Sequence, residues 1–330
     1  MASSAFWKGK RALVTGASGL VGSWLVEELL ERGAEPVCLV RDHVPGSRFL
    51  DEGFDKRVRC VRGSLEDYWV LERTINEYEP QVVFHLGAQT LVPQANRSPL
   101  PTFEANIRGT WNLLEACRVH EKEIANIVVA SSDKAYGEHE NLPYTEDMAL
   151  QGRHPYDCSK SCADLIAQTY AQTYGLPVTI SRCGNFFGGG DLNFNRIVPG
   201  TIKLLRNNER PIVRSDGKMI RDYIYVKDAV SAYLTLAEKY NPKMKGEAFN
   251  FSNETQKNVL ELVELIAKLM GKTKITPIIE NKPVHEIRAQ HLSAKKAREI
   301  LGWKAQYGLE EGLKETIKWY SRYFDRYEKA

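Results

Sequence analysis

The 330-residue chain has no apolar stretch of membrane-spanning length and no excess of charge of one sign. A transmembrane helix needs about 20 consecutive apolar residues, so this sequence is not that of an integral helical membrane protein. It has 45 Lys and Arg against 42 Asp and Glu, a net charge of +3, which argues against nucleic acid or an acidic membrane as a partner. Residues 1–10 also lack the apolar core of a signal peptide, so we expect a cytoplasmic protein.

Metal-ligand patterns are missing too. The six cysteines show no paired spacing of the kind that holds a metal ion. Cys158 and Cys162 lie four positions apart, but no second pair or matching histidine accompanies them. We therefore expect no metal site and six reduced thiols that serve in packing. The 43% of hydrophobic and 26% of charged residues are typical of a globular enzyme.

Short apolar runs alternate with amphipathic stretches through the first half of the chain. Strands are expected at 11–15, 36–40, 81–86, 127–130 and 178–181, and helices near 20–32, 66–78, 102–120 and 155–174. Strands that alternate with helices of this length indicate a parallel sheet covered on both faces. We therefore predict an α/β fold, a Rossmann-like doubly wound parallel sheet.

The pattern changes after Cys183, where a Gly-rich stretch precedes short strands and helices near 259–270, 293–301 and 309–327. This part predicts a smaller C-terminal α/β substrate lobe. Residues 1–183 with 218–253 are expected to form the dinucleotide-binding domain, and 184–217 with 254–330 the lobe. The cleft between them is the expected site.

The turn after the first predicted strand is rich in glycine. It reads TGASGLVG over 15–22 and leads directly into the first predicted helix. Glycines at this place let the backbone approach a pyrophosphate, which then meets the helix N-terminus. The cofactor contacts expected here are Gly16, Ser18, Gly19, Leu20, Val21 and Gly22.

The end of the second predicted strand bears on the choice of dinucleotide. An acidic residue at this position reads the 2′-hydroxyl of NAD, whereas a nearby Arg accommodates the 2′-phosphate of NADP. The strand ends with Val40, Arg41 and Asp42. Arg41 favours NADP, while Asp42 either favours NAD or forms an ion pair with Arg41. NADP or NAD, tightly retained, is thus the expected cofactor, with NADP preferred.

A tyrosine and a lysine lie four apart in YDCSK at 156–160, at the start of a predicted helix. Tyr156 and Lys160 therefore share one helix face. A phenol titrates near pH ~10, and an adjacent ammonium would stabilise its phenolate, so that Tyr156 could act as a base. Ser132 follows a buried strand and could bind the same substrate oxygen, or it could simply cap the next turn.

Six segments together resemble the extended short-chain dehydrogenase/reductase superfamily, in particular its nucleotide-sugar epimerases and dehydratases. They are TGASGLVG, HLGAQ (85–89), NIRGTWNLLEAC (106–117), SSDKAYG (131–137), YDCSK and RDYIYVKDA (221–229), in the family's order over nearly the whole chain. The resemblance implies a nucleotide-diphosphate sugar as substrate and Ser132, Tyr156 and Lys160 as the hydride-transfer set. It implies further cofactor contacts at Leu65, Leu86, Ala88, Tyr156 and Lys160, and substrate contacts at Gln89, Asn185, Arg196, Arg221 and Arg288.

The chain departs from the family pattern at two places near the adenosine. Ser64 replaces an acidic residue often found there, and Val40 occupies the acidic position of NAD-using members. Relatives also pair two helices across a two-fold axis. The apolar faces of the predicted helices around 106–117 and 161–174 therefore predict a homodimer.

The residues after Ser132 distinguish two reactions of this family. Similar 4,6-dehydratases, of the CDP-glucose and GDP-mannose type, have an acid followed by Glu or, in some branches, Lys; epimerases have variable, often small residues. Once C4 of the sugar is oxidised, loss of water across C5 and C6 needs a base at C5 and a proton donor for the 6-hydroxyl. Asp133 fits the donor and Lys134 the base.

Three interpretations stay open at this point. The favoured one is a nucleotide-sugar 4,6-dehydratase with Ser132, Asp133, Lys134, Tyr156 and Lys160 as its catalytic residues. The second is an epimerase, in which Asp133 and Lys134 form only a loop ion pair. The third is a non-catalytic dinucleotide-binding regulator, and the intact Ser-Tyr-Lys set argues against it.

Overall fold

A seven-stranded sheet forms the centre of the computed structural model, which describes residues 2–282 and 287–327. Its order is β10-β6-β5-β4-β1-β2-β3, and every neighbouring pair is parallel. The strands are β1 (Arg11–Thr15), β2 (Glu35–Val40), β3 (Arg59–Arg62), β4 (Val82–His85), β5 (Asn126–Ala130), β6 (Val178–Cys183) and β10 (Ala248–Phe251). The chain begins near the middle and winds outward in both directions, so the predicted doubly wound fold is confirmed.

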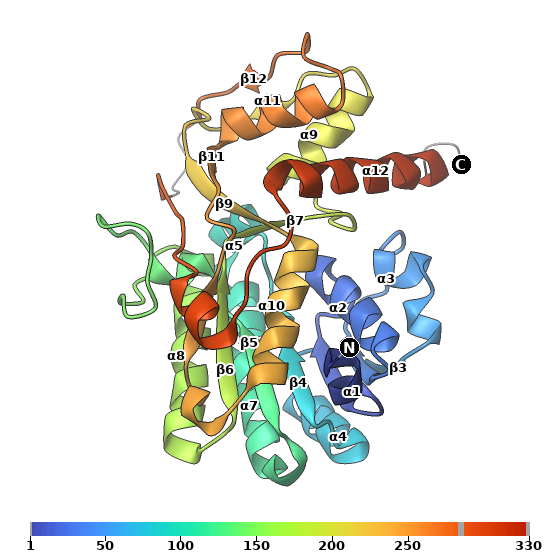
Figure 1. Cartoon of the computed structure of the whole chain (residues 1–330), viewed down its shortest axis with the longest axis vertical. Coiled ribbons are helices and arrows are strands. Elements are labelled where there is room, and N and C mark those ends of the chain that lie inside the picture. The colour runs from blue at the N-terminus through green and yellow to red at the C-terminus, as the bar shows by residue number, and fades with distance from the viewer. Residues whose placement is uncertain (1, 283–286, 328–330) are drawn as a thin grey trace.

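Helices cover both faces of this sheet (Figure 1). Those of one face are α2 (Leu20–Glu31) and α10 (Val226–Lys239), and those of the other are α4 (Tyr68–Tyr78), α7 (Gly109–Val119) and α8 (Pro155–Tyr174). The packing of β1 shows why the three residues at its centre are all apolar. Ala12 and Val14 pack in the core under α2 and α10, while Leu13 packs in the core under α4, α7 and α8. Successive strand residues point to opposite faces, and here both faces are buried.

The predicted helix near 102–120 is divided into three consecutive pieces: α6 (Pro99–Phe103), the π-helical turn η2 (Glu104–Arg108) and α7. π-Helical turns of this kind occur frequently at functional sites.

Several short elements were not predicted from the sequence. They are α1 (Ala2–Trp7), α3 (Arg48–Asp51), α5 (Val92–Arg97) and the 3₁₀ turns η1 (Phe54–Lys56), η3 (Glu121–Glu123), η4 (Asp133–Tyr136) and η5 (Pro242–Met244).

A smaller α/β assembly lies beyond one end of the large sheet, in the upper part of Figure 1. It holds a three-stranded sheet, β11-β9-β7, and the strand pair β12-β8. Its elements are β7 (Asn185–Phe187), α9 (Ile197–Arg206), β8 (Ile212–Val213), β9 (Ile220–Tyr225), β11 (Gln256–Asn258), α11 (Val259–Leu269), β12 (Ile278–Ile279) and α12 (Leu309–Tyr327). A separate apolar core, which includes Phe187, Leu262 and Tyr320, joins them.

The sheets do not follow the predicted domain boundaries at 218 and 254. Strand β9 was assigned to the large domain, but it pairs with β7 and β11 of the small sheet. In the other direction, the turn η6 (Ala297–Leu301) and Trp303 pack in the core of the large sheet, where Trp303 lies edge-on to Phe251 at 5.0 Å. Strand β9 belongs to the small sheet because of its hydrogen-bond partners, and η6 with Trp303 belongs to the large core because of its apolar contacts. Both kinds of partner are distant in sequence. The exact division into two lobes therefore remains a prediction.

Within residues 2–282 and 287–327, no helix is long and apolar enough to cross a membrane. The same residues contain no cluster of three or more His, Cys, Asp or Glu side chains that could hold a metal ion. All six cysteines are free thiols.

Candidate active site

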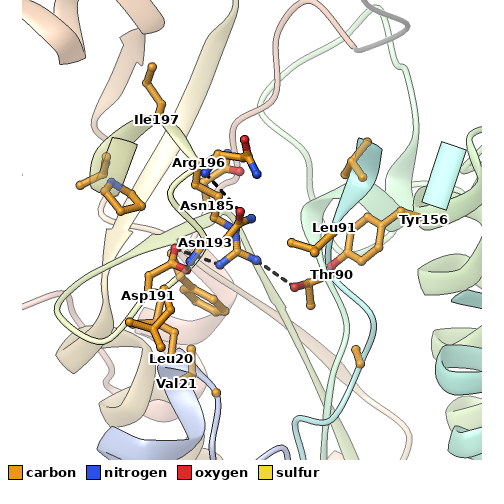
Figure 2. A pocket seen from close by; sticks show the side chains of 18 of the residues that line it. Leu20, Val21, Thr90, Leu91, Tyr156, Asn185, Asp191, Asn193, Arg196 and Ile197 are labelled. Carbon is orange, nitrogen blue, oxygen red and sulfur yellow. Dashed lines mark hydrogen bonds and ion pairs between the residues drawn. The ribbon is translucent and has the colours of Figure 1, made fainter. Parts of the chain in front are cut away.

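A cavity of about 1480 Å³ lies where the carboxyl ends of the central strands meet the small lobe. It brings together the glycine turn after β1, the loop after β5, the first turns of α8 and the segment that follows β7. Figure 2 shows part of its wall, with Tyr156 facing Arg196 and Asn185. All five predicted catalytic residues and all predicted cofactor contacts line this cavity. Carboxyl ends of parallel strands are where doubly wound folds bind ligands.

The glycine turn is shaped by its own backbone. Gly16 has φ 71, which favours glycine, and a Cβ there would lie 2.8 Å from the Gly87 nitrogen. A Cβ on Gly22 would lie 2.1 Å from the Gly16 carbonyl oxygen. Gly19 caps α2, whose first N–H groups have no partner within the helix. The turn therefore fits the pyrophosphate of a dinucleotide.

Gly22→Ala is expected to lower both the free energy of unfolding and cofactor retention. The added methyl group must displace the Gly16 carbonyl, and overpacking of this kind costs about 1–3 kcal/mol. Thermal unfolding and the absorbance of the dinucleotide released from the purified protein measure the two effects. Gly308→Ala is the matched control, because its Cβ would meet nothing within 4 Å. Normal stability and cofactor content in Gly22→Ala would contradict this account.

His85 stands in a buried chain of hydrogen bonds at the end of β4. Thr15 Oγ1 accepts from the Gly87 N–H at 3.0 Å and lies 3.0 Å from His85 Nδ1. On the other side, His85 Nε2 lies 3.0 Å from Thr110 Oγ1, whose own proton goes to the Asn106 carbonyl. Burial, helped by the charge of Lys160, lowers the pKa of His85 to about 3. His85 is thus a neutral imidazole that joins two elements, in a position suited to structure rather than proton transfer.

Asn106 extends this chain to the helix that carries Tyr156. Its side chain accepts from the Gln89 N–H at 2.7 Å and donates to Ser159 Oγ at 2.9 Å. Ser159 Oγ in turn donates to the Tyr156 carbonyl at 2.7 Å. Asn106 is 2% exposed, so these bonds tie the loop after β4 to the first turn of α8. The sequence analysis quoted Asn106 only within a motif, and its contacts with Gln89 and Ser159 join segments that the motif does not contain.

The loop after β5 holds Ser132 and Asp133. Ser132 caps η4 by accepting the Lys134 N–H at 3.2 Å, and it donates to Asp133 Oδ1 at 3.0 Å. The capping interpretation is therefore confirmed, and Ser132 also lines the same cavity as Tyr156. Asp133 is 3% exposed, and burial raises the pKa of its carboxyl although the charge of Lys134 opposes this. Its Oδ2 has no hydrogen-bond partner among the described residues. Burial therefore shifts the Asp133 carboxyl toward its protonated form.

Tyr156 and Lys160 extend from the first turns of α8, which begins with Pro155 at its first position. Lys160 Nζ donates to the Ala130 carbonyl at 2.8 Å, and burial lowers its pKa to about 8 while Asp164 opposes the shift. Burial raises the pKa of Tyr156, and the charge of Arg196 opposes this rise. Assistance to Tyr156 by the ammonium of Lys160 thus remains a prediction.

Three of the five predicted substrate residues line the cavity: Asn185, Arg196 and Arg221. Arg196 lies across it, donating to Asp191 Oδ2 at 3.0 Å and to Thr90 Oγ1 at 2.8 Å (Figure 2). Asn185 Nδ2 is buried and has no hydrogen-bond partner in the described part of the chain. Arg221 is 6% exposed and donates to the Ile220 carbonyl at 2.8 Å. These donors form a wall suited to an anionic substrate.

Gln89 and Arg288 do not lie among the described residues that line the cavity. The Gln89 side chain turns back on its own loop, where Oε1 accepts the Leu91 N–H at 2.8 Å. Arg288 is exposed outside the cavity, and its carbonyl accepts the Ile220 N–H at 3.0 Å. Several other residues that line the cavity were not predicted; among them is Thr90, which accepts a hydrogen bond from Arg196 and belongs to no pattern with recognisable chemistry.

Arg41 lines the cavity directly after the end of β2. Its Nε donates to Asp42 Oδ2 at 2.7 Å, and the two side chains are 63% and 58% exposed. The ion pair considered from the sequence is therefore present. An exposed pair of this kind is weak, so Arg41 can turn to another anion.

The doubly wound sheet, the glycine turn and the Ser-Tyr-Lys set on one cavity define an enzyme of the short-chain dehydrogenase/reductase type. Comparison with known families gives the family. The profile described as GDP-mannose 4,6 dehydratase matches residues 13–316, and the chain belongs to this family.

Individual relatives agree with the family. The CDP-glucose 4,6-dehydratase of Salmonella typhimurium is 32% identical over 96% of this chain and 91% of its own length. Among solved structures, the dTDP-glucose 4,6-dehydratase of Bacillus anthracis in complex with NAD has a TM-score of 0.85 at 28% identity, covering 95% of this chain and 97% of that one. The UDP-glucose 4-epimerase of Thermotoga maritima with UDP-glucose has a TM-score of 0.84, also at 28% identity, covering 94% and 99%.

Proposed function

We propose that this protein is a nucleotide-sugar 4,6-dehydratase, converting an NDP-hexose to an NDP-4-keto-6-deoxyhexose. The observation that carries the proposal is Asp133, a buried carboxyl with one unpartnered oxygen, beside Lys134 and Ser132 on the cavity wall that also holds Tyr156. Epimerisation at C4 needs neither an acid nor a base for the C5–C6 bond. The names of the relatives, CDP-glucose and dTDP-glucose 4,6-dehydratase, support the same reaction.

The cavity fits a nicotinamide dinucleotide as the cofactor. The glycine turn and the N-terminus of α2 would hold its pyrophosphate, and Arg41, Leu65, Leu86 and Ala88 would surround the rest. Tyr156 and Lys160 would contact its nicotinamide end. A bound dinucleotide would supply the hydride acceptor and donor that the reaction needs at C4 and C6 of the sugar.

The residues of the cavity supply the proton transfers. Tyr156 takes the proton of the 4-hydroxyl, assisted by Ser132 and Lys160. The resulting 4-keto group acidifies the C5 proton, which Lys134 removes and later returns to C5 when hydride is delivered to C6. Asp133 then protonates the departing 6-hydroxyl, which leaves as water. Arg196, Arg221 and Asn185 would hold the substrate's diphosphate and sugar, and we retain Gln89 and Arg288 only as weaker proposals.

Incubation of the purified protein with a panel of nucleotide-hexoses tests this function. Mass spectrometry should show loss of one water from at least one member of the panel. A product of unchanged mass with inverted C4 would instead identify the 4-epimerase, which the likeness to the Thermotoga maritima epimerase favours. Retained dinucleotide with no turnover of any panel member would favour the non-catalytic regulator.

Arg41→Ala is expected to weaken NADP binding more than NAD binding. An Arg facing a 2′-phosphate makes a charge-assisted contact that NAD cannot offer, and such hydrogen bonds contribute about 1.5–3 kcal/mol. Titration of the dinucleotide-free protein with each cofactor measures the ratio of the two affinities. Arg57→Ala, a change of the same charge at an exposed site, is the control. Equal losses for both cofactors would show that Arg41 does not select NADP.

We also propose a homodimer formed through α7 and α8. Trp111 on α7 and Leu165 on α8 are 42% and 50% exposed, unusual for large apolar side chains on adjacent helices. Light scattering at micromolar concentration should give twice the chain mass of 37.4 kDa. Trp111→Glu should shift this mass toward one chain. A wild-type mass of one chain would contradict the dimer.

Two further expectations from the sequence remain proposals. The first is the division into a dinucleotide-binding domain and a substrate lobe, with β9 moved to the lobe for its hydrogen bonds. The second is a cytoplasmic location.

A further inference from the structure

We infer that Gln290 is a positioning residue for the elimination step, holding the amine of Lys134 at the cavity wall where it meets the sugar's C5 proton. This inference rests on the proposed dehydratase function. It assigns a role to a residue 156 positions from Lys134 that belongs to none of the recognised motifs.

The contact between the two side chains is direct. Lys134 Nζ donates to Gln290 Oε1 at 2.7 Å. Gln290 is fully buried, whereas Lys134 is half-buried and lines the cavity. A flexible lysine side chain is therefore held at its charged end by an acceptor that cannot itself turn away to solvent.

The backbone around Gln290 is fixed from two sides. The Gln290 N–H donates to the Ile220 carbonyl at 3.1 Å, and the Ile220 N–H donates to the Arg288 carbonyl at 3.0 Å. Two residues further on, the Leu292 N–H donates to Asp222 Oδ2 at 3.2 Å. The segment is thus attached to β9, the strand that presents Arg221 to the cavity.

The amide orientation follows from the chemistry of the lysine. Lys134 Nζ can only donate, so the Gln290 atom that it meets at 2.7 Å is the amide oxygen. Gln290 Nε2 is buried and has no hydrogen-bond partner among the described residues. The contact with Lys134 is therefore the side-chain hydrogen bond that the structure gives to Gln290.

A neutral acceptor suits a lysine that has to lose and regain a proton. A carboxylate at this position would form a buried ion pair and hold the ammonium form. An amide accepts a hydrogen bond from the ammonium and from the neutral amine alike. Titratable groups come from three elements and one loop packed around this pair. They are Asp133 on η4, Tyr144 in the loop after η4, Tyr156 and Asp157 on α8, and Arg221 and Asp222 on β9. Asp133 already supplies one carboxyl, and Gln290 adds no second charge.

Gln290→Glu keeps the shape and replaces the amide by a carboxylate. We expect the acid limb of the pH profile of water loss to move upward by about 1–3 pH units, because an opposite charge within reach favours the ammonium form by that amount. At pH values below the shifted acid limb, the rate of water loss should be about 10- to 10³-fold lower than in the wild-type protein. Reduction of the dinucleotide, measured by absorbance in the same samples, should continue, because it does not use Lys134. Exchange of the C5 proton with deuterated solvent should slow together with water loss.

Two further variants complete the test. Gln256→Glu makes the same change on an exposed side chain and should leave the pH profile in place. Gln290→Asn keeps the amide but withdraws it by one methylene, so water loss should slow without a shift in pH dependence. Thermal unfolding establishes that each variant is folded. If Gln290→Glu does not fold, the test uses Gln290→Asn in a double-mutant cycle with Lys134→Met. In the Lys134→Met background, Gln290→Asn should cause no further loss in the rate of water release.

The outcomes separate this inference from the proposed function. Failure of the wild-type protein to release water from any nucleotide-hexose would overturn the function itself. A wild-type protein that dehydrates, with folded Gln290 variants of unchanged rate and pH profile, would overturn only the role of Gln290. An equal loss of dinucleotide reduction and water loss in both variants would also overturn it, because that would indicate general damage to the site.

Discussion

Tyr156→Phe is expected to abolish the first chemical step, seen as no rise in the absorbance of the reduced nicotinamide when substrate is added. The change removes one oxygen, the atom that would take the proton of the 4-hydroxyl. Loss of a positioned general base costs about 10²–10⁴-fold in rate. Burial raises the pKa of Tyr156, and the charge of Arg196 opposes this rise. Single-turnover absorbance traces measure the effect directly.

The control for this variant lies on the same helix. Tyr174→Phe makes the identical chemical change on α8 at a side chain that is 51% exposed, and it should reduce the cofactor at the normal rate. Tyr156→Phe should still bind dinucleotide and unfold at nearly the wild-type temperature, since the ring remains. Normal cofactor reduction in Tyr156→Phe would remove Tyr156 from the catalytic residues and leave Lys160 or Asp133 as the candidate base.

Asp133→Asn should permit the first step and stop the second. The amide keeps the size of the side chain and can still hydrogen-bond Ser132, but it cannot protonate the 6-hydroxyl. Absorbance of the reduced nicotinamide should therefore rise and then persist, because hydride cannot return to C6 until water has left. Water loss, followed by mass spectrometry, should slow about 10²–10⁴-fold. The two readouts place Asp133 after Tyr156 in the reaction.

Asp147→Asn provides the matched control, because Asp147 is exposed and lies in the loop that follows η4. It should leave both steps unchanged. Full activity of Asp133→Asn in an assay where the wild-type protein releases water would make Asp133 a loop residue. A wild-type protein that only inverts C4, combined with an unaffected Asp133→Asn, would establish the epimerase instead.

Local patterns were sufficient to predict the central sheet. Runs such as RALVT and QVVFHL have consecutive apolar residues at their centres because both faces of the sheet are covered, and this pattern is visible within five or six residues. The glycine turn was equally predictable, since its constraint is the close approach of backbone atoms within one loop, as at Gly16 and Gly22.

Elements with weaker local signals were missed. Strand β3 reads RCVR and buries only Val61 well, so it lacks the apolar run of its neighbours. Strand β7 lies in a Gly-rich stretch and has three residues. Both are strands because of the partners they pair with, β2 and β9, and a local reading of the sequence does not contain those partners.

The sequence by itself determined the fold class, the cofactor turn and the proximity of Tyr156 to Lys160, because each depends on residues within about one helical turn or one βα unit. Only the tertiary structure decided that Arg196 reaches Thr90 across the cavity, that Gln89 turns back on its loop, and that Gln290 meets Lys134. The contacts of Arg196 and Gln290 join residues 106 and 156 positions apart. They depend on the packing of the small lobe on the sheet, because these side-chain ends meet only where several elements fix the backbone at once.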